Sequence, residues 1–168
     1  MTTIILIRHG ESEANRNNVF AGQINPDLQN KGLKQAKLTA EYLSRNYNVD
    51  KIYSSDLKRA FKTAECLGRL LDLEVVIDKN FREIDAGDWE NVKFDDLPIQ
   101  FPNEFDLWVN NIGVAVCPNG ESVNQVADRV MYSLTKLAEE NPEKTVVIAT
   151  HATPIRVAQS MIQTGGLS

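Results

Sequence analysis

The chain has 168 residues, of which 42% are hydrophobic and 24% are charged. This length fits one domain, and a domain of this size buries enough apolar surface to fold without disulfides or a structural metal. Asp and Glu number 23 against 18 Lys and Arg, which gives a net charge of -5. An acidic protein binds nucleic acid and anionic membranes poorly, so neither is expected as a partner.

Two further features bear on the compartment. Cys66 and Cys117 lie far apart in the chain and form neither a CxxC motif nor a zinc-binding spacing. The apolar run at residues 4–7 is too short for a signal peptide or a membrane span. We therefore expect a single cytoplasmic domain over residues 1–168, with both thiols free.

The first half of the chain predicts two strands and two helices. Residues 3–8 are β-branched and apolar, which is typical of a buried strand in a parallel sheet. Residues 11–30 are polar and predict a loop, whereas apolar positions at intervals of three and four predict a helix over 31–47. A second strand is expected at 49–53, and Asp56 is expected to cap the helix that follows it.

The second half continues the alternation. Residues 73–77 and 145–149 predict two more buried strands. The stretch at about 90–118 contains Phe and Trp and is broken by Pro, so we expect it to form a small helical cap insertion. Ser122 and Gln125 fit a capping box at the start of a long helix.

A last helix is expected to start at Thr153 as its N-cap, with Pro154 at the first helical position, and to end at Gly165. Strands that alternate with helices predict an α/β fold with three layers, α/β/α, around a mostly parallel central sheet. Ligands of such sheets bind beyond the carboxyl ends of the strands.

This rule brings chemically active residues to one edge of the sheet. The residues that follow the four strands are Arg8-His9-Gly10, then Ser54-Ser55 with Arg59 one turn further on, then Arg82-Glu83, and finally Thr150-His151. Both histidines of the chain are therefore expected at the same edge, close to arginines and a glutamate.

Such a cluster suits one kind of chemistry. The guanidinium fork of Arg matches the oxygens of a phosphate, and a neutral imidazole is a nucleophile near neutral pH. Phosphoryl transfer depends mainly on positioning and on charge stabilisation, and a nearby carboxylic acid can protonate the leaving oxygen. The pattern therefore predicts metal-free phosphoryl transfer through a phosphohistidine intermediate.

Five segments, in order, resemble the conserved blocks of the histidine phosphatase superfamily, also called the phosphoglycerate mutase-like family. They are RHGES with Asn15 after it (8–12), SSDLKRA (54–60), FREIDAGDWE (81–90), PNGES (118–122) and ATH (149–151). The resemblance spans nearly the whole chain and implies the phosphoglycerate mutase-like fold.

The resemblance also implies a role for each matching residue. His9 would accept the phosphoryl group, and Glu83 would be the general acid and later the base that activates water. The phosphate would be held by Arg8, Arg59 and His151, in a pocket lined by Asn15 and Gln23. No metal or organic cofactor would be required, and the substrate would be a small phosphorylated metabolite.

The sequence departs from the family pattern in a few places. Ala152 stands where a Gly is usual, and Asn91 replaces another Gly, at a position where Asn tolerates left-handed backbone. Gln29 stands where a Thr commonly caps the first helix, and we expect Asn30 to cap it instead. Relatives usually continue beyond the position of Ser168, so we expect the sheet to lack an edge element.

Other readings stay open on the sequence alone. Arg59 could be a solvated helix residue, and Glu83 could pair with Arg82 or with a neighbouring helix. Two other functions also fit the fold: a phosphoglycerate mutase, which returns the phosphoryl group to the substrate, and an inactive binding module. The short chain and the complete set of site residues favour a phosphomonoesterase, most active from mildly acidic to neutral pH. The oligomeric state is open.

Overall fold

The computed structural model describes residues 1–167, which contain a four-stranded sheet. Its strands are β1 (Thr3–Arg8), β2 (Lys51–Ser54), β3 (Val75–Ile77) and β4 (Thr145–Thr150), in the spatial order β1-β4-β2-β3. Every pairing is parallel, so all four carboxyl ends lie at one edge. The predicted parallel sheet is confirmed, although β2 and β3 each begin two residues later than expected.

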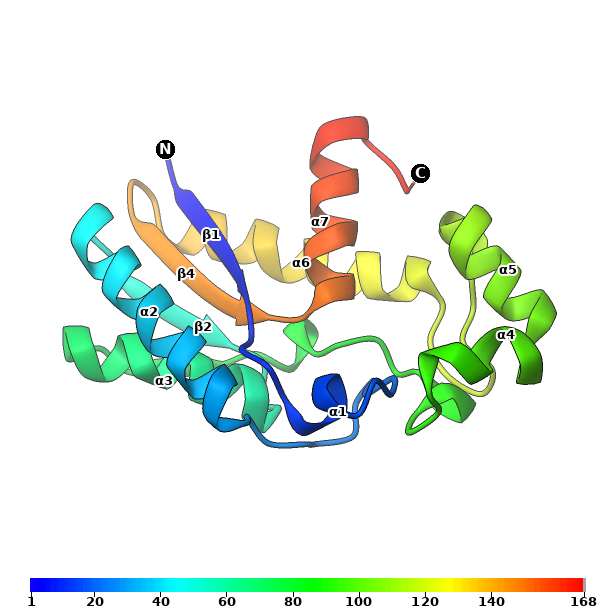
Figure 1. Ribbon diagram of the computed structural model, residues 1–168. Coiled ribbons are helices and arrows are strands. Elements are labelled where there is room, and N and C mark those ends of the chain that lie inside the picture. The colour runs from blue at the N-terminus through cyan, green and yellow to red at the C-terminus, as the bar shows by residue number, and fades with distance from the viewer. Residues whose placement is uncertain (168) are drawn as a thin grey trace.

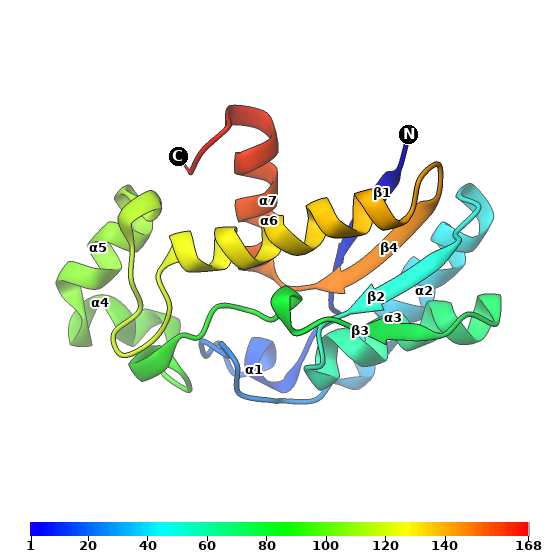
Figure 2. The same ribbon diagram turned by 180° about the vertical axis from the view of Figure 1, so that it is seen from behind.

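Helices cover both faces of the sheet (Figures 1 and 2). Those on one face are α2 (Asn30–Asn46) and α3 (Lys58–Leu71), and those on the other are α6 (Val123–Glu140) and α7 (Ala152–Thr164). Side chains alternate along each strand, so Val147 packs in the core with α2 and α3, whereas Val146 and Ile148 pack in the core with α6 and α7. The three-layer prediction is confirmed.

A small helical cap lies at one end of the molecule (Figure 1). It contains the short helices α4 (Leu97–Gln100) and α5 (Pro102–Asn110), each with a Pro in its first turn. Its aromatic side chains pack on Trp89, which is fully buried, and Trp108 meets both Trp89 and Phe20 edge to face at 5.5 and 5.7 Å between ring centroids. These contacts fix one wall of the cap against the sheet domain.

Several predicted helix starts are wrong. Leu57, not Asp56, is the N-cap of α3, because the Asp56 carboxylate accepts two hydrogen bonds from Arg82. Asn30 does not cap α2 but is its first residue, after a Gln29 whose side chain makes no capping bond. Helix α7 begins at Ala152 with His151 as N-cap, so Thr153 and Pro154 already lie inside it.

The predicted loop also contains the one-turn helix α1 (Glu13–Arg16), which is closed by a capping box between Ser12 and Asn15. Other local predictions are confirmed. Ser122 and Gln125 form a capping box, Asn91 is left-handed with φ 63°, and Gly165 ends α7 with φ 74°.

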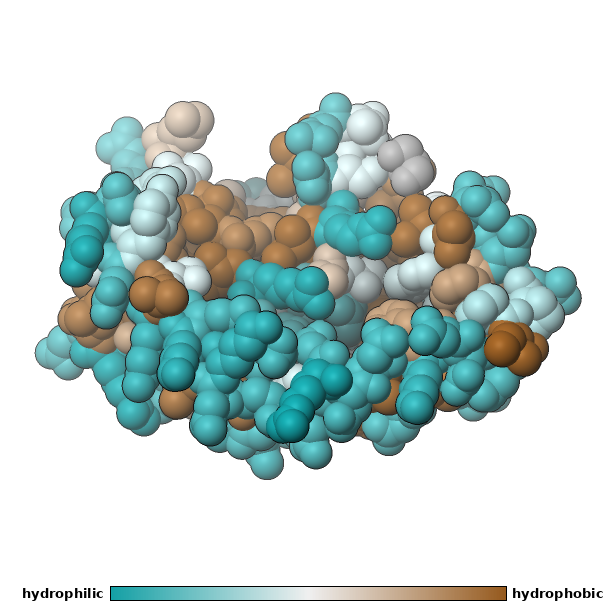
Figure 3. Space-filling model, in the orientation of Figure 1, coloured by the Kyte–Doolittle hydropathy of each residue, from teal (hydrophilic) through white to brown (hydrophobic). Residues whose placement is uncertain are grey.

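No helix within residues 1–167 is long and apolar enough to cross a membrane. The surface beside the edge strand β1, between α2 and α7, is largely hydrophobic (Figure 3).

Candidate active site

The carboxyl ends of β1 and β4 bring the two histidines together. His9 directly follows β1, His151 directly follows β4, and the two strands pair in parallel up to Arg8 and Thr150. The centroids of the two imidazole rings lie 5.1 Å apart. The expectation that residues 142 positions apart in sequence meet at one edge of the sheet is confirmed.

His9 has one defined tautomer. Its Nδ1 lies 2.7 Å from the carbonyl oxygen of Gly10, which can only accept a hydrogen bond, so Nδ1 carries the proton. The other ring nitrogen, Nε2, is then the one with a free lone pair. Burial, together with the charges of Arg59 and Arg8, lowers the pKa of His9 to about 4. The imidazole is therefore a neutral nucleophile at neutral pH.

A close backbone approach fixes the loop after His9. The Gly10 N–H donates to Thr63 Oγ1, which itself donates to the carbonyl of Arg59. A Cβ on Gly10 would lie 2.2 Å from the carbonyl oxygen of Gly32, at the start of α2. The loop thus passes so close to α2 that a glycine is required, and the carbonyl that orients His9 is held in place.

His151 is completely buried behind His9. Its Nε2 lies 2.7 Å from Ser55 Oγ, at the end of β2, while its Nδ1 has no hydrogen-bond partner among residues 1–167. Burial and the nearby charge of Arg59 hold the pKa of His151 well below its usual range. The ring is therefore neutral, with one polar atom left for a group that enters the site.

Arg59 is also buried, so it is not a solvated residue on the surface of α3. It donates to the backbone carbonyls of Gly22 and Ile24 at 2.7 and 2.9 Å, and its Nε has no partner among the described residues. Burial lowers the pKa of Arg59 to about 10, so the guanidinium stays charged at neutral pH. Arg8, in contrast, is an exposed residue at the mouth of the same site.

Glu83 lies at the same edge and is 8% exposed. One carboxylate oxygen accepts from the Ile84 N–H at 2.7 Å, and the other accepts from the Thr153 N–H at 3.3 Å, in the first turn of α7. Glu83 does not pair with Arg82, because Arg82 forms a bidentate pair with Asp56 instead. A carboxyl group held in this way is available to the cavity.

These side chains surround one cavity of about 230 Å³. It is lined by Arg8, His9, Asn15, Arg59 and Glu83, by residues of the loop 19–22, and by Phe94, Trp108, Ala152, Thr153 and Arg156. The Asn15 amide oxygen accepts from Ser12 in the capping box of α1, so its NH₂ group is the part left to face a ligand. The arrangement offers a neutral nucleophile, a carboxyl group and cationic donors around a space for a small anion.

Gln23 is placed differently from expectation, since it does not line this cavity. Its side chain donates to the Glu83 carbonyl and accepts from Arg82, so it braces the segment that carries Glu83. Several lining residues were not predicted as site residues from the sequence, among them Trp108, Thr153 and Arg156. Arg156 follows His151 by five residues, and a helix starting at residue 152 could have placed it at this edge.

Clusters of metal-ligating side chains are absent from the part of the chain described. Among residues 1–167, no group of three or more His, Cys, Asp or Glu side chains could hold a metal ion. His9 and His151, whose ring centroids lie 5.1 Å apart, are therefore not part of a metal-ligand set within the described residues.

Comparison with known proteins agrees with this geometry. The histidine phosphatase superfamily (branch 1) matches residues 4–167. Phosphoserine phosphatase 1 of Hydrogenobacter thermophilus is 37% identical over 156 residues, which cover 93% of this chain and 74% of that protein. The metal-independent phosphoserine phosphatase of Arabidopsis thaliana is 32% identical, over 93% of this chain and 66% of its own.

The fold has solved counterparts as well. The structure of a mycobacterial glucosyl-3-phosphoglycerate phosphatase in complex with VO3 superimposes with a TM-score of 0.87 at 28% identity, over 95% of this chain and 79% of that one. The family match covers nearly the whole sequence, and these relatives are named as phosphatases. The chain belongs to branch 1 of the histidine phosphatase superfamily and is a phosphatase, a phosphoric monoester hydrolase.

Proposed function

We propose that this phosphatase hydrolyses small phosphorylated metabolites without a metal, through a phosphohistidine at Nε2 of His9. The observation that carries the proposal is the bond from Nδ1 to the Gly10 carbonyl, because it leaves Nε2 unprotonated in a cavity with cationic donors. The names of the relatives, which include a metal-independent phosphoserine phosphatase, support the same chemistry.

In the first step, Nε2 of His9 attacks the phosphorus in line, and the bond from phosphorus to the ester oxygen breaks. Glu83, in its protonated form, gives its proton to the departing oxygen, so that an alcohol leaves. Arg8, Arg59 and the NH₂ group of Asn15 bind the phosphoryl oxygens, and the unpartnered Nδ1 of His151 is a further polar contact.

In the second step, a water molecule takes the place of the alcohol. The Glu83 carboxylate accepts a proton from this water as its oxygen bonds to phosphorus, and the bond from phosphorus to Nε2 breaks. Inorganic phosphate leaves, and His9 returns to its neutral form. The same carboxyl group thus acts first as an acid and then as a base, so no outside proton source is required.

The size of the cavity, about 230 Å³, favours small substrates over a phosphoprotein. We also propose a reducing, cytoplasmic compartment, which the two free thiols Cys66 and Cys117 support. Cys117 is buried, and burial raises the pKa of its thiol to about 12, so it is unreactive in the folded protein.

A phosphate-release assay with and without EDTA tests the function. We expect turnover of p-nitrophenyl phosphate to be unchanged by the chelator and to fall by at least about a thousandfold in His9→Ala, because the nucleophile is lost. Circular dichroism of the variant is the control for folding.

Two outcomes would contradict the proposal. One is isomerisation of 3-phosphoglycerate, primed by bisphosphoglycerate and without phosphate release, which would make the protein a mutase. The other is no release from a broad panel of phosphomonoesters by the folded wild type, which would make it a binding module.

A further inference from the structure

Arg156 is a cation in the active-site cavity to which the two steps above give no task. It projects from α7, one turn beyond Ala152 and Thr153, which lie at the edge of the sheet. Its side chain is exposed, and it makes no hydrogen bond or ion pair with any residue from 1 to 167. A guanidinium is always charged in proteins, so this charge is free to bind a ligand.

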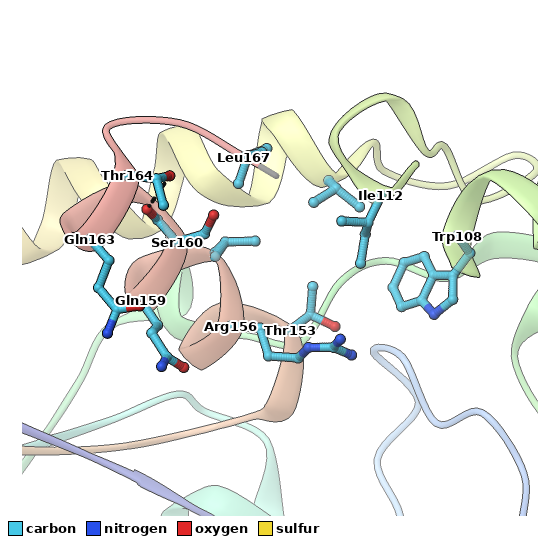
Figure 4. A pocket seen from close by; sticks show the side chains of 11 residues that line it. Trp108, Ile112, Thr153, Arg156, Gln159, Ser160, Gln163, Thr164 and Leu167 are labelled. Carbon is cyan, nitrogen blue, oxygen red and sulfur yellow. Dashed lines mark hydrogen bonds between the residues drawn. The ribbon is translucent and has the colours of Figure 1, made fainter. Parts of the chain in front are cut away.

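The surroundings of Arg156 extend away from the nucleophile. Together with Thr153 and Trp108 it lines both the catalytic cavity and a second one, of about 220 Å³, between α7 and the cap. In Figure 4 the guanidinium group extends from α7 toward the indole of Trp108, with Thr153 beside it. The two cavities therefore meet at Arg156, and a leaving group has a path from the first into the second.

The second cavity offers this guanidinium no acidic partner. Its other lining residues are apolar or uncharged: Trp108, Ile112, Val123, Thr153, Val157, Gln159, Ser160, Gln163, Thr164 and Leu167. Trp108 is held in place by its edge-to-face contacts with Phe20 and Trp89, so the wall opposite Arg156 is rigid and apolar. An ion pair formed beside such a wall is stronger than one in open water.

We infer that Arg156 binds a second oxyanion, carried by the leaving group of the substrate. This inference rests on the proposed function and narrows its substrate class to phosphomonoesters with a carboxylate or a second phosphate near the ester. Arg156 lies one helical turn from the rim of the sheet, about 5 Å along the axis, which suits an oxyanion a few bonds from the ester oxygen. Arg156 is thus a specificity residue, and His9 and Glu83 do the chemistry.

Matched substrates test this inference. O-phosphoserine and O-phosphoethanolamine differ by one carboxylate, and ethylene glycol bisphosphate and 2-hydroxyethyl phosphate differ by one phosphate. We expect Arg156→Ala to lower kcat/KM for O-phosphoserine or for the bisphosphate by about 10- to 100-fold, the usual range for a charged hydrogen bond. The partner lacking the second anion should change less than about threefold. If only the first pair is affected by Arg156→Ala, the bound oxyanion is a carboxylate, and if only the second pair is affected, it is a phosphate.

Two further variants complete the experiment. Arg45→Ala removes the same charge from an exposed position on α2, outside both cavities, and should leave both substrate preferences unchanged. Arg156→Glu should reverse the preference, because the new carboxylate repels an anionic leaving group and attracts the ammonium of O-phosphoethanolamine. Equal losses on both members of each pair, or no loss on either, would overturn the inference.

Binding separates this inference from the proposed function. In a His9→Ala background, calorimetry measures the affinity for O-phosphoserine and for ethylene glycol bisphosphate without turnover. We expect added Arg156→Ala to raise Kd for one of them by about 10- to 100-fold, even if the wild type releases no phosphate. Unchanged affinities would overturn the assignment of Arg156 and leave the roles of His9 and Glu83 untouched.

Discussion

At the scale of single residues, the site depends on a histidine that is kept neutral. Burial lowers the pKa of His9, and the positive charges of Arg59 and Arg8 lower it further. The Gly10 carbonyl accepts a hydrogen bond from Nδ1 and so raises the pKa, but burial outweighs this effect. The result is a pKa of about 4 for His9. The same groups that hold the phosphate therefore also keep the nucleophile in its reactive form.

Nitrogen-15 NMR of the imidazole rings measures this state directly, because the chain has only two histidines. We expect both rings to stay neutral from pH 8 down to about 5, with His9 protonated on Nδ1, since its pKa is about 4 and that of His151 is well below normal. His151→Asn assigns the signals. A His9 ring that titrates near pH 6.5, or one protonated on Nε2, contradicts this description.

The same shift sets the sign of the pH dependence of stability. Between about pH 6.5 and 4 the unfolded chain gains a proton on His9 and the folded protein does not, so acidification favours unfolding. The loss from His9 is on the order of 3 kcal/mol by pH 4, and His151 acts in the same direction. Urea unfolding at several pH values should therefore show a midpoint that falls through this window.

At the scale of secondary-structure elements, helix α6 holds the segment that carries Glu83. Arg129 of α6 donates to the backbone carbonyls of Asn80, Arg82 and Glu83, and pairs with Glu121 through Nε and Nη2. These bonds use all three nitrogens of the guanidinium. Arg129 is therefore a positioning residue, which acts on the reaction through the backbone of residues 80–83.

Arg129→Lys keeps the charge but cannot reproduce these bonds, so Glu83 should be misplaced. We expect kcat/KM for β-glycerophosphate, whose poor leaving group needs a general acid, to fall by at least about tenfold. The value for p-nitrophenyl phosphate, whose leaving group needs none, should change little. Arg69→Lys, in an exposed pair with Glu65, is the control. Equal losses on the two substrates would indicate a purely structural role.

Local signals predicted local structure at this scale. The capping box was correct because Ser122 and Gln125 are three residues apart, and the left-handed Asn91 was correct because it stands in place of a glycine of the family pattern. The cap assigned to Asp56 was wrong because its carboxylate is taken by Arg82, 26 positions away. A partner that distant leaves no periodic trace in the sequence.

At the scale of the whole molecule, the parallel sheet is what assembles the site. Four strands end at one edge, so the residues after each strand meet there, and hydrophobic runs plus the topology rule were enough to predict that His9 and His151 lie together. The roles of Trp108 and Arg156 could not be predicted, since they depend on how the cap packs beside α7.

The most direct test of the account is to trap the phosphoenzyme. Glu83→Gln lacks the base that activates water, whereas p-nitrophenyl phosphate needs no acid for the first step, so the intermediate should accumulate. After a rapid quench, mass spectrometry should find one phosphoryl group, labile in acid and stable in base, on the tryptic peptide His9–Arg16. A phosphoryl group on His151, or phosphate release with no labelled protein at any time, would contradict the account.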